Sequence, residues 1–88
     1  MPTPTYQTSA IEIARINAIP FDKTLQTAHS ILGFVATPTA EELVKAYRAL
    51  GLLIHPDKNE NSAESTTAFK TLQTAYEFIK PIFRNSFQ

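Results

Sequence analysis

The chain has 88 residues, a formal net charge of zero and no cysteine. This length allows one small domain, and the lack of cysteine excludes both disulfides and thiolate metal ligands. A net charge of zero argues against a nucleic-acid-binding protein, because neutralising phosphates needs a basic face. Because 43% of the residues are hydrophobic and only 18% are charged, a folded chain is expected.

The N-terminal residues 1–7 contain two prolines and several threonines and are expected to form a flexible tail. No basic segment followed by an apolar run is present there, so no secretory signal is expected. Apolar runs are too short to cross a bilayer anywhere in the sequence. We therefore expect a soluble, cytoplasmic protein that does not bind membranes.

Two short helices are predicted in the first third of the chain. Residues 9–19 are dense in isoleucine and alanine, which favours a helix ended by Pro20, although the Ile-Glu-Ile run also fits the start of a strand. Residues 22–32 follow helical spacing, with Asp22 as the predicted N-cap. Gly33 stands where the end of a helix favours a left-handed residue.

The clearest helix start is the capping box formed by Thr39 and Glu42, which predicts a helix over residues 40–54. Pro56 restricts His55 to extended backbone and ends that helix. After a turn, Asn61 or Ser62 is expected to cap a last helix over residues 62–80, closed by Pro81.

The two longer helices carry apolar faces that can bury against each other. A short connection between two such helices predicts an antiparallel hairpin, braced by the helix at 22–32. The fold class is therefore all-α. We expect an N-terminal extension (1–21), a main domain (22–80) and an aromatic tail (81–88) that folds back or meets a partner.

Several short motifs match one family pattern in the same order and spacing. They are Leu32-Gly33, Tyr47-Arg48, His55-Pro56-Asp57, Phe69-Lys70 and Ala75-Tyr76-Glu77. Alone, the tripeptide at 55–57 is typical of a turn that stops a helix, because short motifs often match by chance. Together, over roughly residues 25–80, they make the chain resemble the J domain of DnaJ-type co-chaperones.

The resemblance implies a module that is not an enzyme, needs no cofactor and binds a DnaK-type (heat-shock 70 kDa) chaperone, whose ATP hydrolysis it stimulates. It implies partner-binding roles for the loop residues His55, Pro56, Asp57, Lys58 and Asn59, and for Lys45, Tyr47, Arg48 and Lys70 on the flanking helices. Tyr47 fits equally well as an aromatic side chain packed between the helices.

The helix before the loop departs from the family pattern. Val44, Ala49 and Leu53 stand where lysine or arginine is common in the family, and two glutamates offset Lys45 and Arg48. Electrostatic steering toward an acidic partner should therefore be weak. Val44, Leu53 and the C-terminal tail are candidates for a further protein contact or for self-association. The usual fourth helix of the family is not recognisable after Pro81.

Two other functions stay open from the sequence. The first is a J-like interaction module whose coupling to the chaperone has weakened. The second is an enzyme, which is disfavoured because only His29 and His55 titrate near neutral pH and no glycine-rich phosphate loop or nucleophile motif is present. No metal site is expected, and His29 fits best as a residue on a helix face.

Overall fold

The computed structural model describes the backbone of residues 5–84 and the side chains of residues 5–81. This part of the chain forms helices and loops and no strand, which confirms the all-α prediction. The elements are α1 (Ser9–Asn17), α2 (Leu25–Leu32), α3 (Ala40–Ile54), the short 3-10 helix η1 (Pro56–Lys58) and α4 (Ala63–Arg84).

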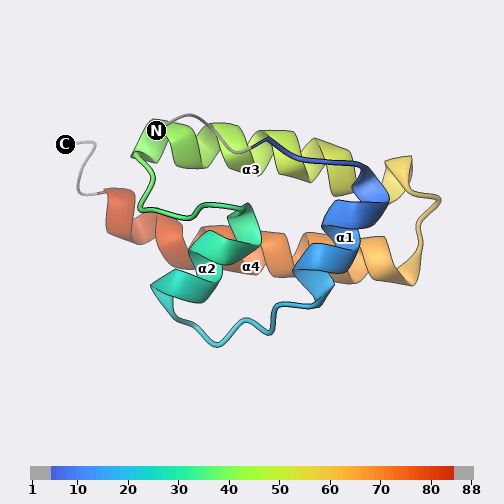
Figure 1. Ribbon diagram of the computed structural model, residues 1–88, viewed down its shortest axis with the longest axis horizontal. Coiled ribbons are helices and arrows are strands. Elements are labelled where there is room, and N and C mark those ends of the chain that lie inside the picture. Colours follow the sequence, from blue (N-terminus) through green and yellow to red (C-terminus); the bar gives the residue numbers. More distant parts are fainter. Residues whose placement is uncertain (1–4, 85–88) are drawn as a thin grey trace.

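Helices α3 and α4 form the predicted antiparallel hairpin, with η1 at the end where they join (Figure 1). The two shorter helices pack against the same side of α4. Helix α1 lies toward the η1 end of the hairpin, whereas α2 lies nearer its other end. The hairpin therefore has a different brace on each half.

One hydrophobic core joins all four α-helices. Its members recur at the helical spacing that the sequence predicts, and a fully buried leucine or isoleucine contributes about 1.5–3 kcal/mol. The buried side chains are Ile13, Ile16, Ala28, Ile31, Leu32, Phe34, Leu43, Ala46, Leu50, Ile54, Ala68, Leu72, Ala75 and Ile79. Helix α1 thus shares the core of the hairpin, while the predicted domain boundaries stay predictions.

Local capping explains why most helix bounds match the prediction. The Thr39 hydroxyl accepts from the Glu42 amide at 3.1 Å, and Glu42 accepts from the Thr39 amide at 2.8 Å, which confirms the capping box. Gly33 adopts a φ of 89° at the end of α2. The Ser62 hydroxyl accepts from the Ser65 amide at 3.1 Å and caps α4.

The predicted N-cap of α2 was wrong, because the helix begins at Leu25 and Thr24 rather than Asp22 caps it. Lys23 has a φ of 64°, which no helical residue adopts, so α2 cannot start at Asp22. Thr24 caps the helix by accepting from the Thr27 amide at 3.2 Å. The Asp22 carboxylate accepts from the hydroxyls of Thr27 and Thr24, and these hydrogen bonds lower its pKa.

The predicted end of the last helix was also wrong. Helix α4 continues through Pro81 to Arg84. Because Pro81 lies in the final turn, its missing N–H removes one hydrogen bond near the helix end and leaves the rest of the ladder intact. The expectation that the aromatic tail folds back falls on residues 82–88, whose side chains lie outside the described part.

Candidate functional site

The His-Pro-Asp corner lies at the exposed end of the hairpin, between α3 and α4 (Figure 1). The side chain of His55 is 40% exposed and that of Asp57 is 81% exposed. None of the three corner residues is buried: His55 and Pro56 are half-buried, and Asp57 is exposed. The polar atoms of the corner are therefore accessible to another molecule.

Backbone hydrogen bonds hold this corner in one shape. His55 is extended, with φ −56° and ψ 134°, as the following proline requires. The amide of Lys58 donates to the His55 carbonyl at 3.0 Å, and the Asn61 amide donates to the Pro56 carbonyl at 2.8 Å. The loop is thus preorganised, which reduces the entropy that a partner must remove on binding.

Two contacts fix the orientation of the His55 ring. Its Nδ1 accepts a hydrogen bond from the Asp57 amide at 3.1 Å, so the neutral ring carries its proton on Nε2. The ring also packs edge-on against Phe69, with centroids 5.0 Å apart. His55 therefore caps η1 with one nitrogen and has the other left to donate.

The carboxylate of Asp57 makes few contacts within the described part of the protein. It makes no hydrogen bond to the described residues, and its nearest basic atom is His55 Nδ1 at 3.9 Å. An exposed carboxylate on a fixed backbone suits a bidentate contact with an arginine. The neighbouring Lys58 is also exposed.

Asn59 points back into the protein. Its side-chain amide donates to the carbonyl of Leu53 at 3.2 Å and to that of His55 at 2.9 Å. Both donors are used to join the loop to the end of α3, where helix carbonyls lack partners. The structure thus gives Asn59 an internal role that the sequence did not indicate.

The charged residues of α3 lie on the solvent side, and its aromatic residue lies between the helices. Lys45 is exposed and forms an ion pair with Glu41 at 3.5 Å. Arg48 is exposed and has no such partner among the described residues. Tyr47 is half-buried and stacks on Tyr76 of α4, with centroids 4.0 Å apart. Tyr47 therefore helps to join the hairpin.

An apolar groove of about 330 Å³ adjoins the corner, lined by Tyr47, Arg48, Gly51, Leu52, His55 and Phe69. Leu52 is 60% exposed, whereas Leu53 is half-buried against the core. Sequence reasoning named Val44 and Leu53 as the unusual apolar residues and missed Leu52. Leu52 lies four residues after Arg48 and three before His55, and this helical spacing could have placed it on the same face as both.

The remaining candidates lie apart from this groove. Lys70 is exposed on α4, next to Phe69 in the sequence. His29 lies on α2, half-buried, with a buried Nε2 that has no hydrogen-bond partner among the described residues. Burial lowers the pKa of His29 and favours its neutral form.

Two other kinds of site find no support in the described chain. Within residues 5–81, no three histidine or carboxylate side chains gather into a metal-binding group. None of the helices over residues 5–84 has the length and hydrophobicity that crossing a bilayer requires.

Several curated relatives are named chaperone protein DnaJ. The protein of Chlamydia trachomatis is 47% identical over 51 residues, which is 58% of this chain and 13% of the relative. Those of Chlamydia pneumoniae and Neisseria meningitidis are 45% and 42% identical over 60 and 54 residues. The chain thus spans only 13% to 15% of the length of these relatives.

The family model of the DnaJ domain matches residues 27–82, from α2 to the last turn of α4. No solved structure gives a significant match. The family match covers more than half of the chain and confirms the resemblance found in its motifs. The chain therefore belongs to the DnaJ domain family, a non-catalytic module of co-chaperones.

Proposed function

We propose that this chain binds a DnaK-type (heat-shock 70 kDa) chaperone through its His-Pro-Asp corner and stimulates ATP hydrolysis by that chaperone. The single observation that carries the proposal is the state of Asp57, an exposed carboxylate on a backbone fixed by Pro56. Membership of the DnaJ domain family supports the same partner class. We also propose that the chain works in the cytoplasm, as expected from its sequence.

In this proposal, each side chain of the corner has a separate task. Asp57 pairs with an arginine of the chaperone, and His55 donates from Nε2. Lys58 contributes a positive charge beside them. Pro56 restricts the backbone, and Asn59 holds the loop to α3.

The flanking helices extend the proposed docking face. Arg48 and Lys45 supply positive charge on α3, and Lys70 supplies it on α4. Tyr47 and Leu52 offer apolar surface through the groove beside His55. The face is mixed rather than strongly basic, so the affinity should fall only modestly as salt rises.

A single-turnover ATPase assay with a purified DnaK-type chaperone tests this function. Saturating wild-type protein should accelerate ATP hydrolysis, and Asp57→Asn or His55→Gln should abolish the acceleration. Glu77→Gln, which neutralises an exposed carboxylate on α4 away from the corner, is the matched control and should behave as wild type. An unchanged hydrolysis rate with saturating wild-type protein would rule the function out.

A second candidate is a J-like interaction module with weakened chaperone coupling. Its support is the near-neutral α3, where Glu41 already pairs with Lys45. Val44, Leu53 and the C-terminal tail would then contact a further protein or a second copy of the chain. A stable partner captured equally by wild type and Asp57→Asn would favour this module, and recovery of only the DnaK-type chaperone would exclude it.

A further inference from the structure

Helix α1 precedes the range that the DnaJ domain family matches, which begins at residue 27. We propose that residues 5–17 are a brace that holds the His-Pro-Asp corner in its docking shape, with Arg15 and Asn17 as positioning residues. The inference rests on the proposed function for its activity readout, but its structural readout is independent of it.

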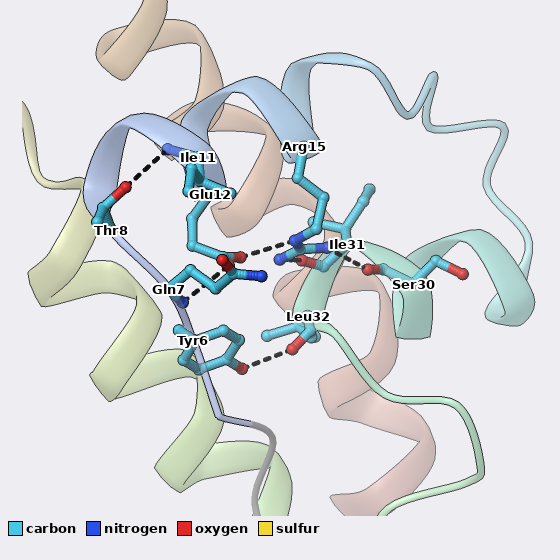
Figure 2. A network of polar contacts seen from close by, with 9 residues as sticks. All are labelled: Tyr6, Gln7, Thr8, Ile11, Glu12, Arg15, Ser30, Ile31 and Leu32. Carbon is cyan, nitrogen blue, oxygen red and sulfur yellow. Dashed lines mark hydrogen bonds and ion pairs between the residues drawn. The ribbon is translucent and has the colours of Figure 1, made fainter.

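The first anchor of the brace is the C-terminal end of α2 (Figure 2). The guanidinium of Arg15 donates to the carbonyls of Ser30 at 2.7 Å and Ile31 at 3.0 Å. The hydroxyl of Tyr6 donates to the next carbonyl, that of Leu32, at 2.5 Å. Carbonyls of a last helical turn lack partners inside the helix, and a cation there also complements the helix dipole.

A buried carboxylate holds the arginine in place. Glu12 is 4% exposed, and its Oε1 accepts from Arg15 Nε at 2.7 Å. Its Oε2 accepts from the Gln7 amide at 3.1 Å, which also fixes the chain before α1 (Figure 2). A buried charge is retained only when it is paired and hydrogen-bonded. The guanidinium is therefore preoriented toward α2.

The second anchor comes from the same last turn of α1 but reaches the start of α4 instead of the end of α2. The side-chain amide of Asn17 donates to the Glu64 carbonyl at 3.1 Å, in the first turn of α4. Ala10, Ile13, Ala14 and Asn17 line one side of a groove whose other side is Asn59 and Glu64. Asn59 is the residue whose amide holds the His55 carbonyl.

Helix α1 also approaches the corner from the side of α3. Ser9 shares a groove with Ala49, Leu52, Leu53 and Lys58, so the start of α1 borders the loop residue Lys58. The brace thus extends from the end of α2 to the end of α3 and the start of α4, which flank the corner. Ile16 fixes its middle in the core, where the side chain is fully buried. A shift of α1 would remove support from the corner without touching His55, Pro56 or Asp57.

The test uses the full chain with Asn17→Ala, which removes one exposed hydrogen bond and no core contact. Amide hydrogen exchange of residues 57–61 should accelerate roughly 2- to 10-fold, the equivalent of one lost hydrogen bond. The concentration for half-maximal ATPase stimulation should rise by a similar factor, with the maximal rate unchanged. Asn17→Gln keeps the amide donor and should restore part of both effects.

Two further variants separate positioning from general stability. Gln73→Ala removes an exposed amide on α4 that makes no hydrogen bond to the described residues, and it should leave loop exchange at the wild-type rate. Arg15→Lys keeps the charge beside Glu12 but loses the two-carbonyl fork, so exchange should rise at the end of α2 and at residues 57–61 together.

Wild-type exchange rates at residues 57–61 in Asn17→Ala would overturn the brace, whether or not Arg15→Lys folds. If wild-type protein fails to stimulate the chaperone, the proposed function fails, and the exchange measurement still decides whether α1 positions the corner.

Discussion

Two polar clusters of this molecule use similar chemical groups in opposite ways. In the network of Figure 2, the side chain of Glu12 is 5% exposed, and its carboxylate accepts hydrogen bonds on both oxygens. At the corner, the side chain of Asp57 is 81% exposed and makes no hydrogen bond to the described residues. A satisfied, buried carboxylate organises the fold, whereas an open one on a rigid backbone is suited to recognition.

The largest expected effect lies in the buried cluster. Arg15→Ala leaves Glu12 as a buried charge without its cationic partner and removes the guanidinium from the carbonyls of Ser30 and Ile31, of which Ser30 still accepts from the Gly33 amide. We expect a loss of roughly 2–4 kcal/mol in the free energy of unfolding, measured by urea denaturation. Asp57→Asn, the counterpart at the corner, should change it by less than about 0.5 kcal/mol. Equal losses for the two variants would remove the contrast between the clusters.

Asn59→Ala tests a residue that shares features of both clusters. Asn59 lies in the loop beside the His-Pro-Asp corner, but its side chain hydrogen-bonds within the protein. Losing its two donors to the carbonyls of Leu53 and His55 should lower the free energy of unfolding by about 1–2 kcal/mol. ATPase stimulation should fall as well, because the loop loses its connection to α3. Wild-type stability with lost stimulation would instead make Asn59 a direct contact residue.

Gly51→Ala tests whether the groove beside His55 takes part in docking. A Cβ at this buried helical position would meet Phe69 at 3.7 Å and Leu72 at 4.0 Å, which are ordinary contacts. Alanine should therefore stabilise α3 by about 0.5–1 kcal/mol while narrowing the groove beside His55. The melting temperature should therefore rise, and the affinity for the chaperone should fall. A rise in both would show that the groove is not used.

The smallest expected effect concerns His29, away from both clusters. Burial lowers its pKa in the folded state below the ordinary 6.5. Well above pH 6.5 the side chain is neutral in both states. As the pH falls through that value, the unfolded chain binds the proton first and stability decreases. His29→Gln should therefore reduce the drop in melting temperature between pH 7.5 and about pH 5.5. An identical drop in the variant would contradict this assignment.

Features set by neighbouring residues were predictable from the sequence. The capping box of Thr39 and Glu42 and the proline after His55 determine both ends of α3 within a few residues. The N-cap of α2 was missed because the left-handed backbone of Lys23 has no clear signal in its residue type. The end of α4 was missed because a proline in a last turn costs little of the helix ladder.

Features set by distant residues were not predictable. Arg15 meets Ser30 and Ile31 only after α1 and α2 have packed together, so the buried network has no local pattern. Asn59 belongs to the corner by sequence, yet only the course of the chain around it turns its amide inward. The outward position of Leu52 rather than Leu53 depends on the rotation of α3, in which each residue advances by about 100°.

The most direct test of the central claim is the rate at which a DnaK-type chaperone hydrolyses ATP in a single turnover, with wild-type protein and with Asp57→Asn at equal folded concentration. We expect wild type to accelerate hydrolysis and the variant to give no acceleration at any concentration. Equal acceleration by both proteins would contradict the account, because the open carboxylate at the corner would then have no part in recognition.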